Sequence, residues 1–147
     1  MELEQPTITT DAAGTQRWQV NGRRHRTDGP AVIYTDGTQH WYVNGCLHRL
    51  DGPAVIWANG HQEWYVNGNL HRLDGPAGIY TNGDQQWWVN GNLHRLDGPA
   101  VIRVNGAQLW YVRGQHLTGI ITSWMQQRDI TWPWDESIQM EFLLSWS

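Results

Sequence analysis

The stretch Trp64-Tyr65-Val66-Asn67-Gly68-Asn69-Leu70-His71-Arg72-Leu73-Asp74-Gly75-Pro76-Ala77 decides the fold, because it returns along the chain every 23 residues. The repeated positions stay in register through the whole middle of the sequence. They are Trp18, Trp41, Trp64, Trp87 and Trp110; His25, His48, His71 and His94; and Asp28, Asp51, Asp74 and Asp97. A fixed period of this length is typical of repeat proteins, in which each unit packs on its neighbours.

Each unit contains two turn signals and two short runs of β-favouring residues. Asn59-Gly60 separates the runs 54–57 and 62–66, and Asn-Gly is favoured in a type I′ turn, whose central residues both need positive φ. The same turn is expected at Asp36-Gly37, Asn82-Gly83 and Asn105-Gly106. A second turn follows each tryptophan run, at Asn21-Gly22, Asn44-Gly45, Asn67-Gly68, Asn90-Gly91 and Arg113-Gly114.

These turns predict an all-β fold, an elongated antiparallel β-hairpin repeat array. The proline of each Asp-Gly-Pro has no N–H for a sheet ladder, so it belongs at a strand start or a crossing. About two strands per unit, at ~4.8 Å spacing, give an array on the order of 45–50 Å long. A two-residue and a three-residue loop would place opposite faces of the hairpin inward, so the sequence leaves the hairpin register open.

The chain divides into three segments. Residues 1–16 form an extended N-terminal lead-in that can supply one edge strand, and residues 17–114 form the array of about four and a half units. Residues 115–147 are expected to cap its last unit with a short α/β segment. In that cap, we expect a helix that starts with Thr118 as N-cap and ends near Gln127. The alternation of apolar and polar residues over 138–146 predicts a strand.

Composition excludes several classes of function. The formal net charge is −4, and residues 17–113 carry nine Arg against seven acidic residues, a balance of +2, which is too weak a basic field for nonspecific nucleic-acid binding. Cys46 is the single cysteine, so neither an internal disulfide nor a cysteine-based metal site is expected. The N-terminal residues 1–6 lack the pattern of a signal peptide, and no apolar run is long enough to cross a membrane. We therefore expect a cytoplasmic protein.

The repeated His, Arg and Asp favour structure over chemistry. A ladder presents the same group many times, whereas an enzyme needs one site with distinct roles. We expect each Asp (28, 51, 74 and 97) to hold its turn and pair with the neighbouring Arg, and each His (25, 48, 71 and 94) to pack between units. Histidines about 10 Å apart cannot share a metal ion, whose ligand bonds are about 2.1 Å long. No catalytic residue, metal site or cofactor is predicted.

The repeat resembles the MORN family in its period, its aromatic strand, its Gly-x-x-His step and its glycine-rich return. Trp64, Gly68, His71, Gly75 and Gly83 stand where that pattern has them. The Asp-Gly-Pro-Ala return differs from the family's usual Gly-x-Gly and is similar to a divergent version found in bacteriophage, large-virus and bacterial antitoxin-like proteins. The resemblance covers residues 17–114. It implies a scaffold that binds proteins or membrane lipids, and the antitoxin-like members imply inhibition of a partner.

The residue types on the array favour a protein partner, because Tyr, Trp and Arg dominate the energetics of protein interfaces. We predict a non-enzymatic protein-binding module, encoded by a phage, that inhibits or sequesters a host or defence protein. The predicted binding residues are Tyr42, Trp57, Tyr65, Tyr80, Trp88, Tyr111, Arg49, Arg72 and Arg95. The alternatives are a structural component that self-associates as a homo-oligomer through its sheet edges, and a scaffold for anionic lipid or another polyanion, against which the balancing Asp residues argue.

Overall fold

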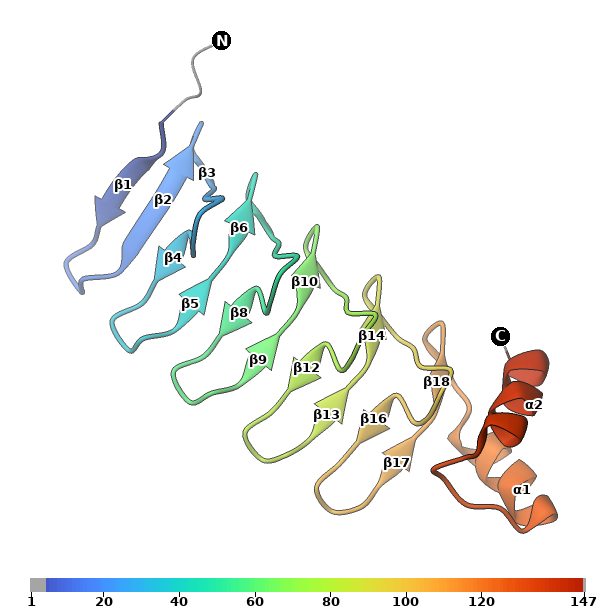
Figure 1. Cartoon of the computed structure of the whole chain (residues 1–147). Helices are drawn as coiled ribbons and strands as arrows, with labels where there is room; N and C mark the ends of the chain where they lie inside the picture. The colour runs from blue at the N-terminus through green and yellow to red at the C-terminus, as the bar shows by residue number, and fades with distance from the viewer. Residues whose placement is uncertain (1–4, 147) are drawn as a thin grey trace.

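The computed structural model describes residues 5–146 and shows a row of antiparallel β-hairpins ending in two helices (Figure 1). One sheet of 11 strands runs through the array in the order β1-β2-β4-β5-β8-β9-β12-β13-β16-β17, with β3 paired to β2. Its strands are β1 (Thr7–Thr10), β2 (Gln16–Val20), β3 (Arg23–Arg24), β4 (Val32–Ile33), β5 (Gln39–His40), β8 (Val55–Ile56), β9 (Gln62–Glu63), β12 (Gly78–Ile79), β13 (Gln85–Gln86), β16 (Val101–Ile102) and β17 (Gln108–Leu109). The predicted array is confirmed, and β1 is the edge strand expected from the lead-in.

Four small hairpins branch from this sheet, one in each unit after the first. They are β6 (Tyr42–Val43) with β7 (Cys46–Leu47), β10 (Tyr65–Val66) with β11 (Asn69–Leu70), β14 (Trp88–Val89) with β15 (Asn92–Leu93), and β18 (Tyr111–Val112) with β19 (Gln115–His116). The branch point is the repeated tryptophan. Trp64 donates its N–H to the Ala77 carbonyl, towards the main sheet, and accepts the His71 N–H, towards the small hairpin. Each tryptophan therefore lies where the strand changes partner.

The hairpin loops between the main strands contain three residues, which settles the register. Val55 pairs with Glu63 and Ile56 with Gln62, leaving residues 58–60 in the loop. In these loops only the glycine has positive φ, as at Gly60 (φ 92°), so the type I′ turn predicted at Asn59-Gly60 and its equivalents is wrong. The Asn59 side chain instead accepts the His61 N–H two residues on, a local bond that Asn and Asp favour.

Turns with positive φ at both central residues occur in the small hairpins. Asn67 (φ 50°) and Gly68 (φ 80°) form one of these two-residue loops. The same conformation recurs at Asn21-Gly22, Asn44-Gly45, Asn90-Gly91 and Arg113-Gly114. Asn tolerates this left-handed conformation better than most residues do, which explains why it stands at four of these five positions.

The cap consists of α1 (Thr118–Arg128) and α2 (Glu136–Trp146). The first helix was expected, although Thr118 does not cap it, because its hydroxyl accepts the Trp110 N–H instead. The strand predicted over 138–146 is wrong: the segment is helical. Ile138, Phe142 and Trp146 are spaced four apart, which places them on one side of a helix, and the Asp135 carboxylate accepts the Ile138 N–H at the helix start.

The array and the cap have different cores. The array buries small side chains, with Ala31, Ala54, Ala77 and Ala100 fully covered, whereas the cap gathers Trp110, Val112, Leu117, Ile121 and Phe142 into one cluster. Neither helix has the length and hydropathy to span a membrane within the described chain. Residues 1–4 of the lead-in, on which most of the signal-peptide argument rests, and residue 147 of the cap lie outside the described residues.

Candidate functional site

The repeated arginine makes three contacts within its own unit. Arg72 lies with its guanidinium carbon 4.1 Å from the centre of the Trp64 ring. Its Nε donates to the Asp74 carboxylate at 2.8 Å and its Nη1 to the Pro76 carbonyl at 3.1 Å. The same three contacts recur at Arg26, Arg49 and Arg95. We call this arrangement the arginine clamp.

The clamp explains two repeated features of the sequence. A Cβ added to Gly75 would lie 3.1 Å from the Arg72 guanidinium carbon, so a side chain after Asp would have to displace the arginine by a few tenths of an ångström. The hydrogen bond from Arg72, and then its charge, lower the pKa of the Asp74 carboxyl, and the clamps do the same for Asp28 and Asp51. The Asp and Gly of the unit are thus partners of the arginine.

The repeated histidines join one unit to the next. The Nδ1 atom of His48 accepts the N–H of Asn67 at 3.1 Å, and His71 accepts that of Asn90 in the same way. His25 and His94 make the equivalent bonds to Asn44 and Arg113. Because Nδ1 is the acceptor, a neutral ring carries its proton on Nε2. The pKa of His94 is lowered by burial and secondarily by the Arg113 charge.

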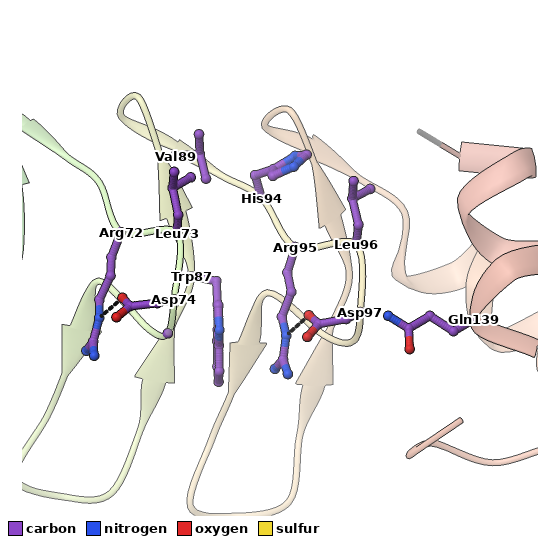
Figure 2. Close-up of a pocket in the computed structure, with 11 residues that line it drawn as sticks. Arg72, Leu73, Asp74, Trp87, Val89, His94, Arg95, Leu96, Asp97 and Gln139 are labelled. Carbon is purple, nitrogen blue, oxygen red and sulfur yellow. Dashed lines mark hydrogen bonds and ion pairs between the residues drawn. The ribbon is translucent and has the colours of Figure 1, made fainter. Parts of the chain in front are cut away.

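Three open grooves lie between consecutive clamp loops. Groove A is lined by residues 26–30, 41, 43 and 48–51; groove B by 49–53, 64, 66 and 71–74; groove C by 72–75, 87, 89, 94–97 and 139. Their volumes are about 700 Å³ for groove A and about 660 Å³ for each of grooves B and C. Figure 2 shows groove C, with Trp87 between the Arg72–Asp74 and Arg95–Asp97 pairs and Gln139 of α2 at its end. Each groove is therefore the same surface, one unit further along.

A fourth position of the same kind is covered by the cap. We call it position D; it comprises residues 95–99, 110 and 112. Trp132 donates its indole N–H to the Asp97 carbonyl over a long 3.4 Å, and the Arg95 guanidinium carbon lies 5.7 Å from its ring. Trp134 stacks on Trp110, which lacks a clamp because Thr118 stands at the arginine position. Trp110 is accordingly 2% exposed, whereas the tryptophans of grooves A to C are half-buried.

The opposite side of the main sheet carries a continuous row of rings. The row consists of Tyr34, His40, Trp57, His61 and Tyr80, and consecutive ring centres lie 5.0, 5.8, 6.0 and 4.3 Å apart. Both ring nitrogens of His40 and the Nε2 of His61 are covered, with no hydrogen-bond partner in the described chain. Burial, and secondarily the Arg24 charge, lower the pKa of His40. We call this surface the aromatic row.

Tyr65 and Glu63 lie beside the aromatic row and interact with its rings. The Tyr65 hydroxyl donates to Glu63 at 3.2 Å, and burial together with the Glu63 charge raises the pKa of Tyr65 to about 12. Burial, and then Glu63, also raise the pKa of Tyr80. His61 Nε2 and Glu63 Oε1 are 3.4 Å apart, an ion pair only when the imidazole is protonated. The carboxylate of Glu63 thus lies among rings that hold it close to the sheet.

The predicted binding residues divide between the two sides of the array. Side chains alternate along a strand, so Tyr65 points away from Trp64 and from the Arg72 that stacks on it. Tyr42, Trp57, Tyr65, Tyr80 and Trp88 belong to the aromatic side, and Arg49, Arg72 and Arg95 line the grooves. Tyr111 follows Trp110 as Tyr65 follows Trp64, so it belongs to the aromatic side as well, but it stacks on His116 at 4.6 Å and is not part of the aromatic row. The prediction that all of them bind one partner remains a prediction.

Sequence reasoning missed Tyr34, His40 and His61 of the aromatic row, and Trp132 at position D. His40 and His61 are absent from the repeat pattern, since Glu63 and Asp84 stand 23 residues after them. A search restricted to retained positions therefore passes over them. The available signal was alternation, because Tyr34, Trp57 and Tyr80 recur at the hairpin ends next to these histidines. For Trp132, no feature of the sequence indicates its contact with Asp97.

Within residues 5–146, no three His, Cys, Asp or Glu side chains come together as metal ligands. Comparison with models of known protein families found no match, and no curated protein matched the chain.

Proposed function

We propose that this chain is a non-enzymatic repeat module that binds another protein. The observation that carries the proposal is the aromatic row, a half-exposed strip of rings that spans three consecutive hairpins on one side of the main sheet. Trp57 at its centre is 41% exposed. Aromatic rings supply large contact area with little loss of side-chain freedom, which is why they are enriched at protein interfaces.

The partner that we propose is a bacterial host or defence protein, which the chain, encoded by a phage and acting in the cytoplasm, inhibits or sequesters. Support for this finer proposal comes from the resemblance of the repeat to MORN-type phage and antitoxin-like proteins, with which the hairpin array is compatible. Membership in that family is part of the proposal. The repeated clamp, which uses the same residues in the same way in every unit, favours a scaffold over an enzyme.

A second candidate function is self-assembly. All four residues of the edge strand β1 are exposed, and an uncovered edge strand offers a template for pairing with another chain. Binding to anionic lipid has less support, because each clamp arginine is paired with an Asp carboxylate 2.6–2.8 Å away. Lipid attraction of this kind needs uncompensated positive charge.

The test is co-purification of the tagged full chain from a bacterial lysate, followed by gel filtration. The matched variants are Trp57→Ala in the aromatic row and Ile8→Ala, which pairs opposite Trp18 on the other side of the sheet and is 57% exposed. We expect one stoichiometric partner that is lost with Trp57→Ala and kept with Ile8→Ala. A chain that elutes alone, or as a homo-oligomer that competes with any partner, would contradict the proposal.

A further inference from the structure

The covered position D shows what kind of group the open grooves accept. Its wall residues are the same as those of groove C one unit earlier: Arg95 for Arg72, Leu96 for Leu73, Asp97 for Asp74. On this wall the cap places an indole, with its N–H directed at the Asp97 carbonyl and its ring beside the Arg95 guanidinium. The cap also covers Leu96, which packs against the cluster around Phe142.

In the earlier units no segment of the described chain covers the equivalent leucine. Leu50 and Leu73 are each 80% exposed, although they occupy the position that Leu96 occupies at the cap. Each of them borders two of the grooves, so the uncovered apolar surface runs along grooves A to C. The chain's own Trp132 is already held at position D and cannot fill them. Any group that fills grooves A to C by this contact therefore comes from another molecule.

The spacing of the grooves restricts the shape of that occupant. Consecutive grooves are one unit apart, which is two sheet strands or about 10 Å. A polyproline II helix rises about 3.1 Å per residue with three residues per turn, so every third side chain returns to one side after about 9 Å. Proline-rich segments of this kind are recognised by grooves lined with aromatic side chains, and Trp41, Trp64 and Trp87 line grooves A, B and C.

We propose that grooves A to C bind a polyproline II segment of a partner protein that carries a tryptophan at every third residue. Each indole lies against a clamp loop as Trp132 lies against Arg95 and Asp97. The inference rests on the proposed protein-binding function but uses the side of the sheet opposite the aromatic row, so the two can fail separately.

The test is fluorescence anisotropy of two labelled peptides of identical composition with the full chain. The first is Trp-Pro-Pro-Trp-Pro-Pro-Trp, with tryptophan at every third position, and the second is Trp-Pro-Trp-Pro-Pro-Pro-Trp, in which the period is broken. Because simultaneous engagement of neighbouring grooves raises affinity through effective concentration, we expect the first peptide to bind on the order of tenfold tighter. Equal binding of the two peptides, or no binding of either at about 1 mM, would overturn the proposal.

Two variants locate the site. The double variant Leu50→Ser/Leu73→Ser changes exposed side chains in all three grooves, and we expect it to weaken the first peptide several-fold without changing the melting temperature. Leu144→Ser is the control, because Leu144 is 82% exposed on α2. Equal loss in both would show nonspecific apolar binding and contradict the inference. A dimer that forms without peptide, measured by light scattering, and that the double variant dissociates would also contradict the inference, because the occupant would then be a second copy.

Loss of partner binding with Trp57→Ala, alongside failure of both peptides, would leave the proposed function standing and remove only this inference.

Discussion

Groove C and position D are built from the same repeated residues and differ in what lies on them. At groove C, Leu73 is exposed and Trp87 half-buried, whereas at position D, Leu96 packs against the cap and Trp110 is 2% exposed. A retained residue of this repeat therefore has no fixed role. The clamp is common to the four complete units, but the surface around it becomes core only where another segment covers it. The same substitution can therefore be made at equivalent positions of two units, one covered by the cap and one open.

The largest effect is expected where the cap is held together. Phe142 is fully buried between Trp134, whose ring centre is 4.8 Å away, and Trp124 and Trp146, both at 6.3 Å. We expect Phe142→Ala to cost about 3–5 kcal/mol through the cavity it leaves, which lowers the melting temperature by on the order of 10 °C in circular dichroism. Leu144→Ala, on the exposed side of the same helix, is the control. Equal melting of the two variants would show that the aromatic cluster around Phe142 does not stabilise the chain.

A smaller loss is expected when one clamp is weakened inside the array. Arg72→Lys keeps the charge but removes the planar fork that reaches Trp64, Asp74 and the Pro76 carbonyl together. With the exposed Asp74 pair discounted for solvent screening, the lost stacking and the bond to Pro76 amount to about 1–3 kcal/mol. Urea unfolding measures this free energy.

The control for the clamp is Arg103→Lys. Arg103 is 49% exposed on its side chain and approaches Asp84 only to 3.7 Å, so its replacement is expected to leave the unfolding midpoint within error. If Arg103→Lys and Arg72→Lys shift the midpoint equally, the clamp contributes no more than a surface ion pair does.

The same leucine-to-serine substitution, made in separate variants at Leu96 and at Leu73, compares position D with groove C directly. Leu96→Ser removes an apolar side chain that packs under the cap, and we expect it to cost about 1–2 kcal/mol. Leu73→Ser makes the same replacement in a side chain that is 80% exposed, and we expect a change within about 0.5 kcal/mol. Equal destabilisation in urea unfolding would mean that the cap covers Leu96 without stabilising it.

Sequence reasoning succeeded where the controlling interactions are local or periodic. The 23-residue period, the turns of the small hairpins and the clamp partners lie within one unit, so each copy repeats the same evidence. The helix at 118–128 was also predicted, from the spacing of its apolar residues. Where two local patterns compete, the prediction failed: the spacing of Ile138, Phe142 and Trp146 fits a helix, although the alternation of the same segment fits a strand.

The remaining errors concern contacts and register that no local pattern determines. Trp132 meets Asp97 across 35 residues of sequence, and no periodicity links the two. The three-residue loop depends on a side-chain bond such as that of Asn59 to the His61 N–H, which competes with the type I′ turn that Asn-Gly also favours. Alternation places Tyr65 opposite Trp64, and the stacking of Arg72 on Trp64 then places Arg72 on the side away from Tyr65, a contact that the sequence alone leaves open.

The smallest effect is expected at the last histidine contact between units, where His94 accepts the Arg113 N–H. Arg113 replaces the asparagine found at this turn in the earlier units, and it holds φ at 51°, a conformation that Asn adopts more readily than Arg. Its N–H donates to His94 Nδ1 at 3.0 Å, and its charge adds to the burial that lowers the pKa of His94. Arg113→Asn keeps the N–H and removes the charge. We therefore expect the pKa of His94, followed by NMR of its ring proton, to rise towards the ordinary value of 6.5.

The sign of the accompanying stability change follows from the direction of that shift. Because the folded state disfavours protonated His94, its contribution to stability is present above pH 6.5 and is lost as the pH falls through the lowered folded-state value. Removing the Arg113 charge reduces this acid-side loss, so the variant should gain most, relative to the parent chain, below pH 6.5. At neutral pH the relief of the left-handed backbone alone is expected to stabilise the chain by a few tenths to about 1 kcal/mol. A variant that gains stability equally at every pH would assign the whole effect to the backbone and none to His94.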